Sequence, residues 1–120
     1  MISYSDLALM LLFTFMLYLT SKNHLIKLEQ LLKDFQLWSD ISPSVSAMTS
    51  TAPFCCDVMA FEQWLQFIFI PKMTELIVLR QPLPTNMALA PMAEHVWQSK
   101  PHGSVMITQL QQFDALLSQR

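Results

Sequence analysis

The sequence has a single glycine, Gly103, among its 120 residues, and this scarcity excludes several common sites. Loops that bind phosphate through their backbone need two or more glycines at fixed spacing. A P-loop and a dinucleotide-binding loop are therefore excluded. A turn-rich β-sandwich is also disfavoured, because tight hairpin turns rely on glycine.

Charge is also scarce. Only 13% of the residues are charged, and seven Lys and Arg stand against nine Asp and Glu, which gives a net charge of −2. No run of basic residues occurs. Proteins that bind nucleic acid electrostatically need clustered Lys and Arg to neutralise phosphates. We therefore expect no direct contact with nucleic acid.

The only cysteines, Cys55 and Cys56, are adjacent. Neighbouring cysteines rarely bond to each other, because the resulting ring strains the peptide. We expect two reduced thiols in a cytoplasmic protein. A disulfide to another chain or a redox role remains the alternative.

Motifs for catalysis or metal binding are missing: the sequence has no HExxH, no CxxC and no nucleophile triad at a family spacing. His95 and His102, with Glu94 nearby, come closest to a metal site, but a helix is expected to end between the two histidines. Asp57 is interpreted as a helix N-cap and Glu94 as a first-turn carboxylate. We expect no enzyme activity, no cofactor and no metal.

Apolar residues make up 52% of the chain and are concentrated near its start, where twelve of the thirteen residues of 7–19 are apolar. A cleaved signal peptide is disfavoured because no basic residue precedes Lys22. Three alternatives stay open: a short membrane anchor whose following Lys22 and Lys27 hold the rest of the chain in the cytoplasm, an added core helix, or a true start at Met10 or Met16. We divide the chain into an extension, 1–21, and a helical domain, 22–120.

The domain shows helical periodicity. An amphipathic helix is predicted over 22–38, and further helices over 57–70, 71–80, 91–99 and 104–117. Pro71 should kink the helix that ends at residue 70, or start the next helix at residue 71. The predicted buried positions are Leu25, Leu28, Leu31, Leu32 and Phe35 in the first helix, Phe61, Trp64, Leu65 and Ile68 in the second, Met92, Ala93, Val96 and Trp97 in the fourth, and Met106, Leu110, Phe113 and Leu117 in the last.

Local signals complete this prediction. Ser104 is a candidate N-cap, and Pro91 a candidate helix start. In the last helix Gln109, Gln111, Gln112 and Asp114 are expected to face water. Residues 39–53 read as a long loop, packed down by Ile41, Val45 and Met48. Helices with one apolar stripe each must bury those stripes together, so the predicted fold is all-α: a small bundle or irregular array of about four helices, plus the apolar extension.

Several motifs in order resemble the YqcC-like family of small bacterial proteins. They are Asp57-x-Met59-x-Phe61-x-x-Trp64-Leu65-Gln66, then Ile70-Pro71-Lys72-Met73, Leu83-Pro84 and Pro91-Met92-Ala93-Glu94-x-x-Trp97. The resemblance implies a roughly four-helix cytoplasmic protein with no established activity. In some genomes its members lie near a tRNA pseudouridine synthase gene. Because members begin shortly before the first amphipathic helix, it also favours a start near Met16.

The leading hypothesis is a non-enzymatic interaction or accessory protein that binds an unknown protein partner or itself. The alternatives are an accessory factor for tRNA pseudouridine modification and a membrane-tethered helical module at the inner membrane. The predicted interaction surface comprises Trp64, Lys72, Pro82, Pro84, Pro91, Glu94 and Trp97, a set rich in tryptophan and proline.

Overall fold

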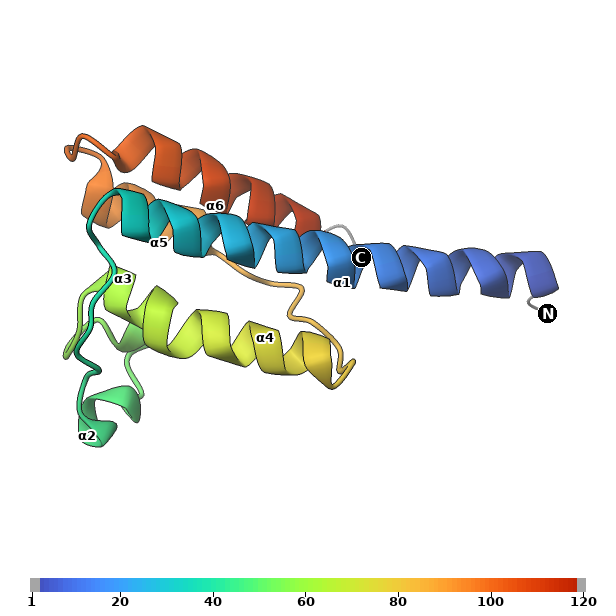
Figure 1. Ribbon diagram of the computed structural model, residues 1–120, viewed down its shortest axis with the longest axis horizontal. Coiled ribbons are helices and arrows are strands. Elements are labelled where there is room, and N and C mark those ends of the chain that lie inside the picture. Colours follow the sequence, from blue (N-terminus) through green and yellow to red (C-terminus); the bar gives the residue numbers. More distant parts are fainter. Residues whose placement is uncertain (1–2, 119–120) are drawn as a thin grey trace.

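The computed structural model describes residues 3–118, and these residues form only helices, turns and irregular loops (Figure 1). The all-α prediction is confirmed. Residues 1–2 of the predicted segment 1–21 and residues 119–120 of the predicted segment 22–120 lie outside the described residues. In chain order the elements are α1 (Tyr4–Asp34), α2 (Val45–Met48), η1 (Pro53–Cys55), α3 (Phe61–Trp64), η2 (Leu65–Phe69), α4 (Ile70–Val78), α5 (Leu89–Trp97) and α6 (Gly103–Leu117).

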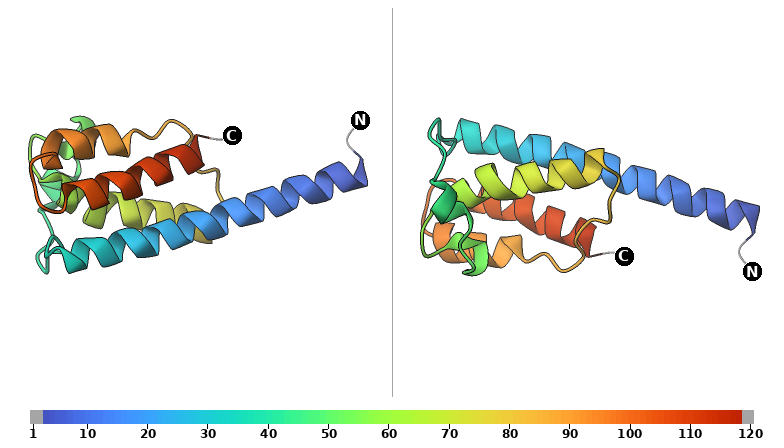
Figure 2. Two further views of the ribbon diagram at one scale, coloured as in Figure 1. Left: turned by 90° about the horizontal axis from the view of Figure 1, so that it is seen from above. Right: turned by 90° about the horizontal axis from the view of Figure 1, so that it is seen from below.

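Helix α1 is continuous across the predicted boundary at 21/22, and at 1.5 Å per residue its 31 residues extend about 46 Å. Its second half packs against α4 and α6, whereas its first half projects beyond the bundle (Figures 1 and 2). The projecting side chains are exposed, so the core-helix alternative for residues 7–19 is wrong. Within that segment only Leu17 is buried.

The end of α1 shows how the chain manages with little glycine. The helix stops at Asp34 and not at the predicted Trp38, because Gln36 turns into the left-handed region with φ 59°. The N–H of Leu37 then bonds to the carbonyl of Leu32 at 2.7 Å, which closes a Schellman motif. Arg80 ends α4 in the same way, with φ 56°. Both positions usually favour glycine.

The elements α3, η2 and α4 form one helical rod with a π-helical turn, η2, directly before Pro71. The N–H of Ile70 bonds to the carbonyl of Leu65, five residues back. Such a turn inserts one residue into the helical register. Phe69 is therefore buried where the regular period predicted Ile68, which is only half-buried. The expected irregularity at Pro71 is present, but the helix continues through it.

Helices α5 and α6 are joined by a tight turn at Gly103, which is the first residue of α6. A Cβ at this position would lie 2.1 Å from the carbonyl oxygen of Trp97, so only glycine fits. Ser104 is thus inside the helix and is not its N-cap, and α5 starts two residues before Pro91.

The burial of α5 and α6 follows the prediction in part. The buried residues of α5 are Leu89, Ala90, Ala93 and Trp97, and Met92 and Val96 are half-buried against the core. On α6, Gln109 is buried and Asp114 is half-buried, so neither faces water as expected.

Of the three predicted anchors of the loop after α1, Met48 is half-buried and the other two are exposed. Ile41 and Val45 are 79% and 81% exposed, and neither anchors it. Leu37, Trp38 and Phe54 pack against the core instead. Asp57 accepts a hydrogen bond from Ser50 Oγ at 2.7 Å, and Ala60 is the N-cap of α3, so the capping role of Asp57 is also wrong.

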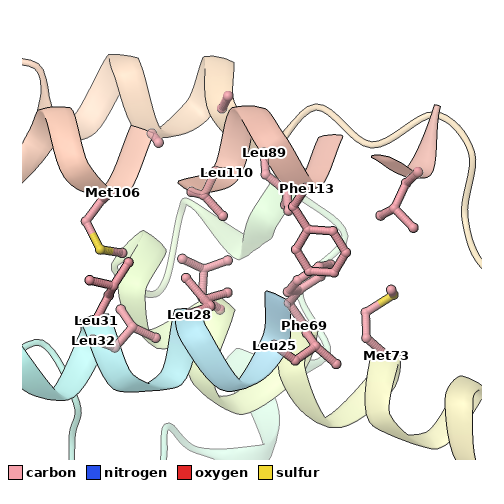
Figure 3. Packing of buried hydrophobic residues seen from close by; sticks show 14 of the residues in the cluster. Leu25, Leu28, Leu31, Leu32, Phe69, Met73, Leu89, Met106, Leu110 and Phe113 are labelled. Carbon is pink, nitrogen blue, oxygen red and sulfur yellow. The ribbon is translucent and has the colours of Figure 1, made fainter. Parts of the chain in front are cut away.

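The core lies between α1, α4, α5 and α6, and α6 contacts both α1 and α5. Figure 3 shows Leu28 and Leu31 of α1 facing Met106 and Leu110 of α6. The predicted stripes of α1 and α6 are buried, except that Phe35 is half-buried. Burying a leucine contributes about 1.5–3 kcal/mol, so these two stripes supply a substantial part of the stability of the bundle.

Candidate interaction surface

An apolar groove of about 260 Å³ runs between α1 and α4 on the outside of the bundle. Its walls are Lys22, Leu25, Ile26 and Glu29 from α1 and Ile70, Thr74, Ile77 and Val78 from α4. The groove is accessible because Ile26 and Val78 are 58% and 71% exposed. An exposed apolar groove between two helices is the kind of surface that binds another protein segment.

A second hollow, of about 400 Å³, lies at the base of the projecting half of α1 and shares Lys22 and Ile77 with the first. Its other walls are Leu11, Thr14, Phe15, Tyr18, Leu19 and Arg80. Tyr18 Oη donates a 2.6 Å hydrogen bond to the carbonyl of Gln81, which ties the loop after α4 to α1. Lys22 and Arg80 give this end of the groove a positive charge.

Two tryptophans of the predicted surface belong to an aromatic cluster. Phe61 stacks with Trp64 at 6.0 Å between ring centroids and meets Trp97 at 5.3 Å. Phe54 and Trp64 meet in a T-shaped arrangement with 4.8 Å between ring centroids. Trp97 is 3% exposed, so it is a core residue, and its place in a partner-facing surface is wrong. Trp64 is half-buried.

The other predicted residues do not form one patch. Lys72 and Pro82 lie toward opposite ends of α4, and Lys72 is within 3.8 Å of Glu75. Pro91 and Glu94 are exposed on α5, where Glu94 accepts a 3.3 Å hydrogen bond from Gln111. Pro84 is half-buried. Whether any of these exposed residues contacts a partner stays a prediction.

Two titratable groups have shifted pKa values. His24 stacks on Phe113 and its Nδ1 lies 2.9 Å from Gln109 Nε2; burial lowers its pKa below 6.5. Burial raises the pKa of Asp114, partly offset by hydrogen bonds from the N–H groups of Ala90 and Leu89. Both side chains lie between helices and contribute to the contacts that hold these helices together.

Residues 3–118 contain no group of three or more His, Cys, Asp and Glu side chains that could hold a metal ion. His102 packs against Phe35 and Trp97, whereas His95 is exposed, so the two histidines do not converge. Of the two free thiols, Cys55 is buried and Cys56 is exposed.

The sequence pattern did not point to Ile26 and Val78 as residues of the groove. The available signal was an apolar residue outside the buried stripe of its own helix: Ile26 follows the core position Leu25, and Val78 follows Ile77. A single off-stripe residue is common on protein surfaces. Only the approach of α1 and α4 turns two such residues into a groove.

The fold and the groove together define a small all-α protein with an apolar surface between its first helix and its central helical rod. The chain belongs to the family described as DUF446: tRNA pseudouridine synthase C, whose model matches residues 20–116. The resemblance drawn from the motifs is thereby confirmed.

The relatives include the uncharacterized protein YqcC of Escherichia coli, 36% identical over 92 residues, which are 76% of this chain and 84% of the relative. An uncharacterized protein of Haemophilus influenzae is 36% identical over 74 residues, 62% of this chain and 70% of the relative. The solution NMR structure of E. coli YqcC superposes with a TM-score of 0.77 at 33% identity and covers 86% of this chain and 89% of that one.

A third relative is longer. It is named tRNA pseudouridine synthase C, from Pectobacterium carotovorum, and is 29% identical over 79 residues. These residues are 66% of this chain but only 21% of that protein. A segment similar to this chain is thus a minor part of a protein with that name.

Proposed function

We propose that this chain is a non-enzymatic accessory protein that binds a tRNA pseudouridine synthase in the cytoplasm. The observation that carries the proposal is the Pectobacterium relative, in which a similar segment makes up 21% of a protein named tRNA pseudouridine synthase C. Segments that share one polypeptide in one organism often act together as separate chains in another. In the proposed accessory role, the chain therefore binds the enzyme and takes no part in its chemical reaction.

The surface of the chain supports binding to the enzyme rather than to its RNA. The groove between α1 and α4 is apolar, and the chain carries a net charge of −2. RNA binding depends on clustered cations that release counterions, and the sequence contains no run of basic residues. An apolar groove suits an apolar protein segment. We place the contact with the synthase in this groove.

The test is co-purification of the full chain with the tRNA pseudouridine synthase from the same cells, followed by sedimentation of the mixture. We expect a complex of defined stoichiometry that Ile26→Glu weakens by about tenfold or more, because a carboxylate would lose its water in the groove. Ile41→Glu is the matched control, since Ile41 is equally apolar and 79% exposed outside the groove.

A gel shift with tRNA at low salt completes the test. We expect no shift with the chain alone. The proposal fails if no complex forms, or if the chain shifts tRNA by itself. A complex that is insensitive to Ile26→Glu but lost with Lys72→Glu or Glu94→Lys would overturn the groove assignment and favour the surface predicted from the sequence.

A further inference from the structure

The projecting half of α1 is apolar around its whole circumference. The five consecutive residues 9–13 point in all directions, because successive side chains are about 100° apart, and each is 52–64% exposed. A partner helix covers a stripe along one side and would leave the opposite side in water. A helix that is apolar on every side is matched by a solvent that surrounds it, which is the hydrocarbon of a bilayer.

The candidate span Tyr4–Asp34 includes an 18-residue window with a mean hydropathy of 1.4, of which only 11% is buried inside the protein. The low burial distinguishes this helix from the core helix of a soluble bundle. Between Asp6 and Lys22 the helix carries no charge. These two residues are about 24 Å apart along the helix axis. The hydrocarbon core of a bilayer is ~30 Å thick, and the side chains of Asp6 and Lys22 can extend toward its two opposite surfaces to make up the difference.

Thr14 is the one polar residue between Leu7 and Leu17, and its hydroxyl is satisfied within the helix. Thr14 Oγ1 donates a 3.0 Å hydrogen bond to the carbonyl of Met10, and the backbone is helical throughout. This internal pairing is the condition for a polypeptide to enter hydrocarbon, where no water can replace a missing partner.

Figure 2 shows that the C-terminal end of α4 lies at the end of the bundle from which α1 projects. There the last turn of α4 exposes Val78 and Leu79, at 71% and 56%. Tyr18 lies at the same level, where it lines the second hollow together with Leu19 and its hydroxyl is bonded to the carbonyl of Gln81. Tyrosines favour the boundary between hydrocarbon and headgroups, because the ring is apolar and the hydroxyl is polar.

The charges at this level are positive. Lys22 and Arg80 line the same hollow as Leu11 and Phe15. The acidic residue nearest in the groove, Glu29, is paired with Lys33 at 3.1 Å. Cations at the base of the apolar helix complement anionic phospholipid headgroups and hold the attached domain on the cytoplasmic side.

We propose that residues 4–19 of α1 insert into an anionic phospholipid bilayer and that the bundle rests on its cytoplasmic surface through Val78, Leu79, Lys22 and Arg80. This inference does not rest on the proposed binding to a synthase, although Lys22 and Val78 belong to both surfaces. It assigns the exposed apolar surface of the projecting half of α1 to lipid and not to a second copy of the chain.

The test is cell-free synthesis of the full chain in the presence of vesicles made of phosphatidylethanolamine and phosphatidylglycerol, followed by flotation and an alkaline wash. The wild-type chain is expected to float and to resist the wash. The triple variant Leu9→Gln, Leu11→Gln, Phe13→Gln should bind at least about tenfold less, because three side chains would lose their burial in lipid.

The matched control is Ile41→Gln with Val45→Gln, which replaces exposed apolar residues at the other end of the bundle and should float like the wild type. Circular dichroism checks that each variant keeps its helix content, which glutamine supports. The double variant Lys22→Glu, Arg80→Glu should bind these vesicles about tenfold less, with little change on phosphatidylcholine vesicles.

Depth is measured with Phe13→Trp, whose fluorescence brominated lipids should quench more strongly than that of the wild type. The proposal is overturned if the wild-type chain stays at the bottom of the gradient or the triple variant floats equally well. A defined dimer that ignores vesicles would assign the helix to self-association and also overturn it. The proposal is likewise overturned if the native protein is soluble and begins at Met16.

Discussion

The carboxylate of Asp114 accepts a 2.8 Å hydrogen bond from the main-chain N–H of Ala90 and so joins the last turns of α6 to the first turn of α5. Its other oxygen accepts from the N–H of Leu89 at 3.1 Å. Amides in the first turn of a helix have no partner within the helix. Here a residue from another helix takes the place of a local N-cap, which Ala88 cannot supply.

We expect Asp114→Ala to lower the free energy of unfolding by about 1–3 kcal/mol, because two half-buried amides lose their acceptor. Asp114→Asn keeps one acceptor oxygen and should cost less. Urea denaturation measures both. Asp34→Ala is the control, since Asp34 contacts only Gln30 on the exposed surface of α1. An equal loss for Asp34→Ala would contradict this role of Asp114.

Gln66 holds the loop that follows α1. Its side-chain amide bonds to both the N–H and the carbonyl of Ser39, at 2.8 and 2.7 Å, and Gln66 is only 7% exposed. We expect Gln66→Met, which keeps the length and loses both partners, to speed proteolysis within residues 39–53 and to cost about 1–3 kcal/mol. Gln112→Met, at an exposed position of α6, should do neither.

Gly103→Ala should destabilise the protein by roughly 1–3 kcal/mol or more, because the new Cβ would collide with the carbonyl oxygen of Trp97 at 2.1 Å. Relief requires α5 and α6 to move apart. Calorimetric unfolding measures the effect. Ser104→Ala, at the exposed next residue, should leave the transition almost unchanged; a normal transition for Gly103→Ala would refute the close approach.

His24 should make stability depend on pH. Burial lowers its pKa in the folded protein below 6.5, so the unfolded chain takes up the proton first as the pH falls. The free energy of unfolding should therefore decrease as the pH falls below 6.5 and level off below the folded-state pKa. A protonated Nδ1 also cannot accept the hydrogen bond from Gln109.

Urea denaturation at a series of pH values checks this dependence, with the difference between wild type and His24→Gln isolating the contribution of His24 from that of Asp114. His95→Gln is the matched substitution at an exposed histidine of α5. A wild-type curve that matches His24→Gln at every pH would rule the linkage out.

Much of the helical plan followed from local pattern. The leucine stripe of α1 and the stripe of α6 are buried as their spacing predicted, because a period of 3.6 residues places them on one face. Errors arose where the backbone departs from that period. The π turn before Pro71 moves burial from Ile68 to Phe69, and no periodic template contains this extra residue.

The candidate site was less predictable. Trp97 was predicted to lie on the interaction surface because the residues near it in the sequence include proline. In the structure, Phe61 and His102 pack against it. Ile26 and Val78 were not predicted to form a site, because each lies outside the buried apolar stripe of its own helix. A groove depends on how two helices approach, which the periodicity of either helix does not encode.

The sequence by itself determined the all-α class, the family and the exclusion of phosphate loops, because helical periodicity, ordered motifs and a single glycine are local properties of the chain. Tertiary structure alone decided which polar residues are structural. Asp114 and Gln66 find their partners 24 and 27 residues away, and such pairs exist only once helices meet. It also decided that the apolar start of α1 stays outside the core, since α4 and α6 end before they could cover it.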